Sequence, residues 1–475
     1  MYDFRKRGYV HYGPISDVIP SKPIFDMYLA GFFSLVSYLE ERGVKTGVFN
    51  IAAKMVNNPD VDVARLIRQI DAKVYGIDLH WLVHSHGALE LAKLVKEVTG
   101  RPVILGGLAA TYYWREVLEN PFVDVVVLGD AVEPVLYLLL QKLEKDLLEE
   151  LEKIPNVAYR TDGGIKFTGL KCVPAELDEL RPKYDIVVKV MVRSGIDLSL
   201  PWSTFLKHPI ATVMTYKGVS TTVWHVGGRF AYSVVFQRKN LGVKRLETVF
   251  EEYREITDRL KEPLYFVGDL QVLGKTYIEK LTQPLGGEKR DVDVIFEFFA
   301  PPPREVLGLL RKAGERVYLQ ISPKSHDEEI RRRYGRPYTN HELKTFLRNA
   351  KQLGFERVDV YLMIGLPGQT VENVTIGSFF EELWQEAPNM VDAFVAPLAP
   401  FVDPGSLAFY KSAVYGYKLY AYILTEHREL LLAKNWYEML NYETQWLTRR
   451  EIAEATYNAV ENLAKSKHKV GLIDD

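Results

Sequence analysis

The chain has 475 residues, a length typical of about three domains, and it carries a net charge of −2. Its hydrophobic content of 47% provides enough apolar side chains for buried cores. The near-neutral charge excludes a general attraction to nucleic acid or anionic membranes. No apolar run reaches the ~18 residues of a membrane helix, and the start lacks the apolar core of a signal peptide, so we expect a cytoplasmic protein.

Residues 1–145 alternate between helical and strand patterns. Helical spacing covers 26–43, 61–70, 87–100 and 133–145, and apolar strands are expected at 45–51, 72–79, 102–107 and 122–130. This alternation predicts an α/β domain with a doubly wound parallel sheet of the Rossmann or flavodoxin type. Ligands of such sheets bind beyond the carboxyl ends of the strands, which here read DLHW, GGLAAT and GDAVE.

Residues 146–205 have a different pattern. A charged helix over 144–154 is followed by a strand, an Asp-Gly-Gly turn and a second strand over 156–169, which predicts a β-hairpin. We interpret this region as a connector between two domains.

Residues 206–400 return to alternation. Strands are expected at 210–216, 263–270, 292–300, 316–323, 357–367 and 391–400, and helices at 246–260, 276–283, 304–314, 340–354 and 371–385. Six units are too few for a closed eight-unit barrel, so we predict a partial TIM-type (β/α)6 barrel whose chemistry lies at the strand ends. Residues 401–475 are predicted to form a helical cap. The polar residues at the strand ends are Tyr216, Asp269, Glu297, Ser322 and the turn at Gly365–Pro367.

The stretch TYKGVSTTVWHVGGR, residues 215–229, has Val219, Val223 and Val226 at a spacing typical of metal-binding cysteines. In isolation, apolar residues at this spacing are an ordinary helical stripe. The single cysteine, Cys172, excludes an intrachain disulfide and any site that needs two thiolates. We interpret Cys172 as an inert structural thiol.

The motifs in their order along the chain resemble the radical S-adenosylmethionine (SAM) proteins that carry an N-terminal cobalamin (B12)-binding-type domain. The similarity rests on ILGGLAATYY and VDVVVLGDAVEP in the N-terminal half. In the C-terminal half it rests on ISPKSHDEEIRRRYGRPYTNHEL, VDVYLMIGLPGQTVE and PLAPFVDPGS. The resemblance implies reductive cleavage of SAM for radical methyl transfer or rearrangement, with a [4Fe–4S] cluster held by the loop C-x3-C-x2-C.

In this chain each of those three ligand positions is valine. Valine has no lone pair, and one imidazole from His225 cannot replace three thiolates. We therefore expect no cluster at this loop, and we assign no other metal site and no catalytic residue. The replacement is consistent both with a natural paralogue that lost radical chemistry and with an engineered chain whose ligands were exchanged for residues of similar volume.

The resemblance also implies binding residues. For SAM these are Tyr216, His225, Gly268, Asp269, Ser322, Lys324, Gly365 and Pro367. Asp269 has the alternative role of a helix cap, and Arg331 to Arg333 are interpreted as a solvated helix face. For cobalamin the implied residues are Gly106, Gly107, Thr111, Gly129 and Asp130.

The histidines near the first of these strand ends do not favour a cobalt ligand. The family motif D-x-H-x-x-G is broken by Val83, so only a cobalamin without a histidine ligand is expected, and an empty domain kept for packing is the alternative. His80, His84 and His86 do not share the spacing of one ligand face, so we interpret them as surface or satisfied histidines.

Three functions stay open at this point. The first is an enzyme lineage that is inactive in radical chemistry. The second is a cluster-free pseudoenzyme that binds SAM or cobalamin, for which an active paralogue is a candidate partner. The third is a structural remnant. We expect no nucleic-acid or membrane partner, and no motif identifies the small-molecule substrate.

Overall fold

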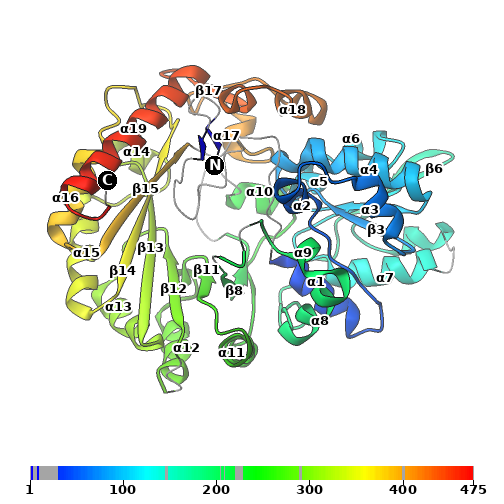
Figure 1. The fold of residues 1–475 in the computed structure, drawn as a ribbon, viewed down its shortest axis with the longest axis horizontal. Coiled ribbons are helices and arrows are strands. Elements are labelled where there is room, and N and C mark those ends of the chain that lie inside the picture. Colours follow the sequence, from blue (N-terminus) through cyan, green and yellow to red (C-terminus); the bar gives the residue numbers. More distant parts are fainter. Residues whose placement is uncertain are drawn as a thin grey trace.

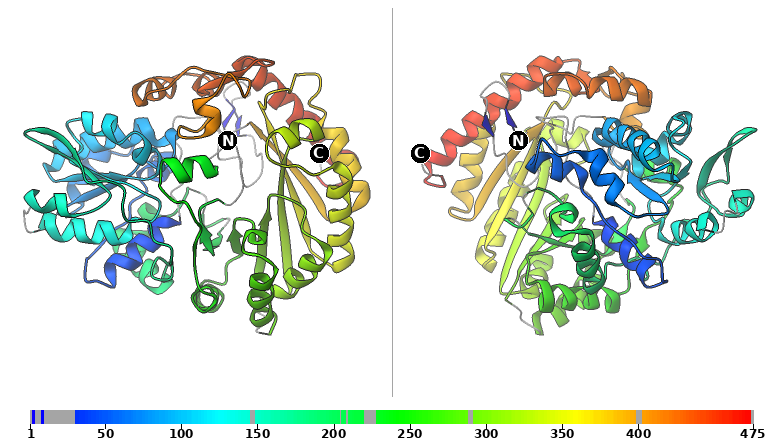
Figure 2. Two further views of the ribbon diagram at one scale, coloured as in Figure 1. Left: turned by 180° about the vertical axis from the view of Figure 1, so that it is seen from behind. Right: turned by 45° about the vertical axis from the view of Figure 1, so that its right-hand side comes forward.

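The computed structural model describes residues 2–3, 8–9, 30–144, 148–203, 205–207, 209–219, 228–287, 291–397 and 402–473. An N-terminal α/β domain and a larger barrel-like domain lie side by side (Figure 1), and the C-terminal segment crosses above both (Figure 2). The short strands β1 (Tyr2–Asp3) and β2 (Gly8–Tyr9) pair with each other near the barrel.

The N-terminal sheet has the strand order β3-β4-β5-β6-β7. Its first three strands are parallel and its last two, a hairpin, are antiparallel. Their bounds are β3 Tyr75–Asp78, β4 Val103–Gly106, β5 Val125–Val127, β6 Val157–Thr161 and β7 Gly164–Phe167. The predicted hairpin therefore forms, and it extends the N-terminal sheet instead of standing apart as a connector.

Helices cover both faces of this sheet. Leu105 packs against the α3, α4 and α6 side, while Ile104 packs against α7, as the pleat of a doubly wound sheet requires. Helix α4 ends at Gly100, whose φ of 65° is the left-handed cap that glycine favours. The helices on this domain are α3 Val63–Gln69, α4 Ser85–Thr99, α5 Leu108–Tyr112, α6 Trp114–Glu119 and α7 Glu133–Glu144, with 3₁₀ turns at Leu82–His84 and Leu148–Lys153.

The strand predicted over 45–51 is wrong. Residues 44–50 are irregular, and Ile51 begins helix α2 (Ile51–Asn57) with Asn50 as its cap. The backbone of this segment bonds to distant residues: Val48 N donates to Ser194 Oγ at 3.1 Å, and Asn50 N donates to Leu198 O. These partners belong to α8 (Tyr184–Ser194) and α9 (Ile196–Ser199), which with α1 (Gly31–Glu40) pack beside the sheet and leave β3 at its edge.

The second domain is an open barrel of six parallel strands in the order β15-β14-β13-β12-β11-β8, which confirms the predicted six units. The strands are β8 Ala211–Met214, β11 Leu264–Val267, β12 Asp293–Phe298, β13 Arg316–Lys324, β14 Arg357–Ile364 and β15 Val391–Pro397. The covering helices are α11 Leu246–Glu255, α12 Lys275–Gly287, α13 Arg304–Leu310, α14 Glu328–Arg333, α15 Asn340–Leu353 and α16 Ile376–Glu386. Of residues 371–375, predicted as helix, 371–373 form a turn and 374–375 are irregular before α16.

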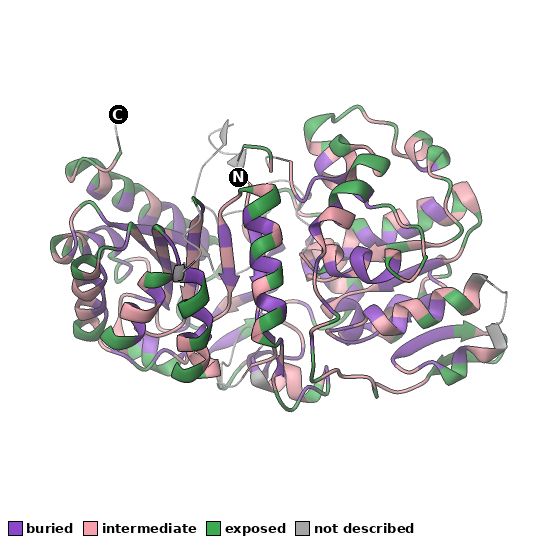
Figure 3. Ribbon diagram, turned by 90° about the horizontal axis from the view of Figure 1, so that it is seen from below, coloured by how far each residue is buried: buried purple, intermediate pink, exposed green. Residues whose placement is uncertain are grey.

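Burial alternates along the barrel strands. Val294, Phe296 and Phe298 of β12 are buried against the helices, whereas Ile295 and Glu297 are partly exposed on the other face. Figure 3 shows buried residues concentrated on the strands and exposed residues on the outer faces of the helices. Each such strand has one packed face and one open face, so the inner wall of the barrel carries apolar side chains such as Ile295 as well as polar ones such as Glu297.

The C-terminal segment joins the two domains. Ala455, Ala459 and Leu463 of α19 pack into the barrel core, and His427 Nε2 of α18 lies 3.0 Å from Tyr113 Oη of the N-terminal domain. The segment contains α17 Leu407–Tyr410, β16 Tyr417–Leu419, α18 Leu424–Leu430, a 3₁₀ turn Trp436–Met439, β17 Tyr442–Thr444 and α19 Arg449–Lys469. The predicted cap is thus helical apart from one antiparallel strand pair. No helix in the described part of the chain is long and apolar enough to span a membrane.

Candidate functional site

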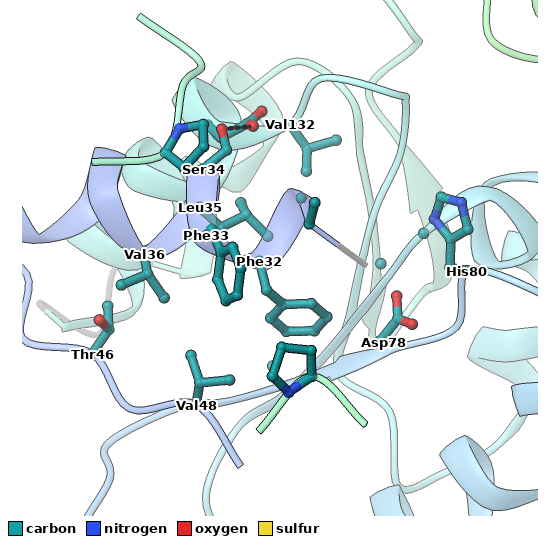
Figure 4. Close-up of a pocket in the computed structure, with 18 of the residues that line it drawn as sticks. Phe32, Phe33, Ser34, Leu35, Val36, Thr46, Val48, Asp78, His80 and Val132 are labelled. Carbon is teal, nitrogen blue, oxygen red and sulfur yellow. Dashed lines mark hydrogen bonds between the residues drawn. The ribbon is translucent and has the colours of Figure 1, made fainter. Parts of the chain in front are cut away.

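A cavity of about 2420 Å³ lies between the two domains, and carboxyl ends of strands from both sheets line part of it. Single ligand pockets usually measure ~300–1,000 Å³, so this space exceeds the needs of one small ligand. Figure 4 shows part of its wall, where Phe32 of α1, Val48, Val132 and the strand-end residues Asp78 and His80 surround the opening.

The N-terminal wall is built on two glycine turns. Gly107 has a φ of 115°, and a Cβ there would lie 2.6 Å from His80 N, so only glycine fits between β4 and the end of β3. Thr111 Oγ1 donates to Gly107 O at 2.8 Å and accepts from Gly129 N at 3.0 Å. Of the residues implied for cobalamin, Gly106, Gly107, Gly129 and Asp130 line the cavity, and Thr111 holds the turns from behind.

Asp130 is committed to a contact between the domains. Its carboxylate accepts from Arg238 Nε at 2.5 Å and from Nη2 at 3.0 Å, and its carbonyl accepts from Lys217 Nζ at 2.6 Å. Arg238 Nη1 donates to Pro174 O at 2.8 Å. Both charged side chains are buried, so this pair fixes the width of the cavity between the two sheets.

The histidines at the end of β3 differ in their surroundings. His84 Nδ1 lies 3.2 Å from Asp78 Oδ2, so these two side chains contact each other at the end of β3. Burial lowers the pKa of His80 to about 4, which makes it a neutral imidazole on the cavity wall. Burial also lowers the pKa of the third histidine, His86. Among the described residues, no group of three His, Cys, Asp or Glu side chains is arranged to hold a metal ion.

On the barrel wall, three residues meet at the ends of adjacent strands. The Tyr216 hydroxyl of β9 (Tyr216–Lys217) donates to Asp269 O at 3.3 Å, and Gly268 N donates to Glu297 Oε2 at 2.8 Å. Gly268 has a φ of 88°, and a Cβ there would lie 2.8 Å from Tyr216 Oη. Tyr216, Gly268 and Glu297 all line the cavity.

Asp269 has the alternative role predicted for it, that of a cap. Its carboxylate accepts from Gln271 N at 3.0 Å, Gln271 Nε2 at 3.2 Å and Phe299 N at 2.9 Å, which caps the 3₁₀ turn Leu270–Leu273. The side chain is buried and lies behind the cavity wall. Asp269 therefore shapes the strand end, and its carboxylate oxygens are already occupied.

Ser322 and Lys324 lie near each other but outside the cavity lining. Lys324 has a φ of 68° at a register shift of β13, and its Nζ donates to Tyr334 O at 3.2 Å. Burial, with a contribution from Arg336, lowers the pKa of Lys324 to about 7. Arg336 Nε donates to Ser322 O at 3.1 Å, so the Lys324 and Arg336 side chains are each held by a backbone carbonyl.

The prediction of a solvated face for Arg331 is wrong. Its guanidinium is fully buried and donates to the carbonyls of Ser325, His326 and Tyr338 at 3.0 to 3.1 Å. Arg332 and Arg333 are exposed, as predicted. The buried guanidinium thus organises the β13–α15 connection.

The turn at Gly365 and Pro367 faces the C-terminal cap. A Cβ at Gly365 would lie 2.7 Å from Tyr442 Oη, and one at Gly416 would lie 3.0 Å from Pro367 Cβ. Both turn residues lie outside the cavity lining. Their placement supports the packing of the cap on the barrel.

The motif loop is described only in part. Val219 lines the cavity, whereas Val223, His225 and Val226 lie outside the described residues. Cys172 is half-buried beside β5 and α7, and its backbone pairs with the Asn156 side chain at 2.7 and 2.8 Å. Burial raises the pKa of the Cys172 thiol, and the residue does not line the cavity.

Several wall residues were not selected from the sequence as ligand-binding candidates. Gln320 could have been found, because it is the polar residue at an inward position of the apolar strand β13. Lys217 and Arg238 offered no such signal, since their partner Asp130 lies about a hundred positions away in the sequence.

The comparisons with known proteins agree with this architecture. Residues 18–139 match the family model described as B12 binding domain, and residues 232–376 match that described as Radical SAM superfamily. The fold is similar to that of the radical SAM methyltransferase TsrM from Kitasatospora setae, solved with tryptophan and a SAM analog, at 13% identity and a TM-score of 0.62 over 85% of this chain and 78% of that one.

A second similar structure is the cobalamin-dependent SAM radical enzyme OxsB, solved with aqua-cobalamin and SAM. Identity is 15% and the TM-score is 0.62, over 94% of this chain and 65% of that one. No curated protein matches the sequence. At these identities the structural likeness establishes the fold, which confirms the predicted class: a Rossmann-like domain joined to a partial radical SAM-type barrel.

Proposed function

We propose that this chain, a radical SAM superfamily protein with an N-terminal B12-binding domain, binds cobalamin and SAM in the interdomain cavity and holds no [4Fe–4S] cluster at the motif loop. The observation that carries the proposal is the cavity of about 2420 Å³ into which the strand ends of both domains open. A structural remnant is less well supported, because glycine turns at Gly107 and Gly268 keep the strand ends of both domains accessible from the cavity.

The N-terminal wall fits a large, flat cofactor. A Cβ on Gly106 would meet nothing closer than Val127 O at 3.7 Å, and one on Gly76 would meet nothing within 4 Å, so both glycines leave the wall bare. Val132 and Leu136 add an apolar surface. Cobalamin, when bound, supplies methyl-transfer or radical chemistry, and these residues would hold and shield it.

The barrel wall fits SAM. Tyr216 and Gly268 would present an aromatic ring and an accessible backbone turn within this wall. Asp269 supports this wall by capping the turn, so its removal would act on binding indirectly.

The motif loop does not fit the cluster. Val219 offers only methyl groups at the cavity, and Cys172, the single thiol of the chain, packs at a different place in the N-terminal domain. Three iron atoms cannot be held without thiolates, so we assign no reductive cleavage of SAM to this loop. The proposed activity is therefore cofactor binding, with methyl transfer as the reaction class suggested by the TsrM likeness.

The experiment is calorimetric titration of the purified chain with hydroxocobalamin and, separately, with SAM. We expect saturable binding of both, and Gly106→Leu is expected to weaken hydroxocobalamin binding at least tenfold because its side chain enters the cavity. Gly163→Leu, in the turn between β6 and β7, is the control that leaves binding unchanged. Absence of heat with both cofactors would overturn the proposal in favour of the structural remnant.

A further inference from the structure

The barrel side of the cavity contains a group of polar side chains that no part of the proposed cofactor binding requires. Glu297 of β12 and Gln320 of β13 are register partners on neighbouring parallel strands, so their side chains leave the same face side by side. Both line the cavity, and Tyr265 of β11 lines it one strand further along.

The Glu297 carboxyl is only partly satisfied. It accepts from Gly268 N at 2.8 Å and from the Tyr265 hydroxyl, while a carboxylate has about four acceptor positions. Among the described residues, no lysine, arginine or histidine forms an ion pair with it at contact distance. Burial raises the pKa of Glu297, and the charge of Arg336 opposes this only in part, because the Arg336 Nε donates to Ser322 O.

The surroundings of this group are apolar and aromatic. Ile295 lies on the same face of β12, Met214 lines the cavity from β8, and Phe299 lines it beyond the end of β12. The Arg336 guanidinium lies 4.5 Å from the centroid of the Phe299 ring, which fixes that ring in the wall. Glu297 therefore carries a carboxyl group into a largely apolar part of the cavity, where a missing counter-charge is costly.

We propose that Glu297, Gln320 and Tyr265 form a substrate subsite for the protonated primary amine of a small apolar or aromatic molecule. The ammonium group would supply the donors and the positive charge that Glu297 lacks, and the Gln320 side-chain carbonyl would accept one further hydrogen. The apolar walls would hold the rest of the molecule, and a carboxylate in its place would be repelled. This assignment rests on the proposed function, because it places a substrate beside the cofactors.

The test is ligand-observed saturation-transfer NMR with 2-phenylethylamine and 3-phenylpropionate as probes on the full chain. We expect the wild-type protein to bind the amine at least tenfold more tightly than the acid, as a charge-assisted hydrogen bond of ~1.5–3 kcal/mol implies. Glu297→Gln keeps an acceptor for Gly268 N, and it should weaken binding of the amine at least tenfold. The control Glu315→Gln, at an exposed position before β13, should leave amine binding unchanged.

Each contrary result is decisive. Equal binding of amine and acid, no amine binding, or full amine binding by Glu297→Gln would overturn the subsite. If that variant fails to fold by circular dichroism, Gln320→Leu takes its place and is expected to weaken the amine severalfold. A protein that binds hydroxocobalamin but not the amine contradicts the subsite alone, whereas one that binds the amine but not hydroxocobalamin contradicts the proposed function alone.

Discussion

The Asp130 carboxylate and the Arg238 guanidinium form a bidentate ion pair, at 2.5 and 3.0 Å, that joins the N-terminal domain to the barrel. Asp130 ends the β5 turn at the cavity, and Arg238 follows helix α10 (Arg229–Val234) just after the motif loop. Since Lys217 also donates to Asp130 O, the loop region is tied to the N-terminal wall from both sides. A buried polar contact therefore fastens the two domains to each other beside the cavity.

Removing one member of this pair should destabilise the chain strongly. Arg238→Met leaves the Asp130 carboxylate buried without a cation, which costs ~3–5 kcal/mol. Urea unfolding followed by tryptophan fluorescence measures the loss. Arg333→Met removes an exposed pair with Glu329 and should cost at most ~1 kcal/mol, so equal losses in the two variants would contradict the account.

The turn between β4 and α5 should tolerate no side chain. Gly107→Ala places a Cβ 2.6 Å from the Leu79 and His80 backbone at a φ of 115°, which costs on the order of 1–3 kcal/mol and shifts the cavity wall. We expect lower stability and weaker hydroxocobalamin binding. Gly87→Ala on α4 meets nothing within 4 Å and should stabilise by up to ~1 kcal/mol, and unchanged binding in Gly107→Ala would count against this role of the turn.

Lys324 should make stability depend on pH. Burial lowers its pKa from about 10.5 in the unfolded chain to about 7 in the folded one, so between these values the unfolded state binds more protons. Because of Lys324, the free energy of unfolding should therefore rise with pH above about 7, by at most ~1.4 kcal/mol per pH unit. Urea unfolding at pH 7, 8 and 9 should show this slope in the wild type and lose it in Lys324→Met, and identical slopes would show that Lys324 does not titrate in this range.

Cysteines at the motif loop should restore a cluster site if the loop can still close around iron. The triple change Val219→Cys, Val223→Cys and Val226→Cys supplies the three thiolates that the family spacing requires. After anaerobic reconstitution with iron and sulfide, we expect about four irons per chain and absorption in the visible charge-transfer region. The same three positions changed to Ala are the control, and a folded triple-Cys chain that takes up no iron would show that the loop can no longer form the site.

Local patterns predicted the barrel strands well, because alternating burial along strands such as β12 depends on residues two positions apart. The apolar residues of segment 45–51 have similar spacing, but its backbone forms hydrogen bonds with Ser194 and Leu198 and not with β3. These partners are about 150 positions away, so no local pattern could predict them. Likewise, the three consecutive arginines in the sequence do not reveal that Arg331 is buried and its neighbours exposed. The partners of Arg331 are backbone carbonyls that come together only in the folded chain.

The part of the site that lies at strand ends could be predicted from the sequence. Gly106, Gly107 and Gly268 lie on the cavity wall because parallel strands bring their carboxyl ends to one edge. Gly365 and Pro367 instead support the C-terminal cap, whose position over the barrel no local pattern encodes.

The proposed function requires that the cavity bind cobalamin and that the motif loop bind no cluster. It is tested most directly by anaerobic reconstitution of the wild-type chain with iron, sulfide and hydroxocobalamin, followed by counting iron and cobalt per chain after desalting. We expect about one cobalt per chain and less than one iron per chain. About four irons per chain, or no retained cobalt, would contradict it.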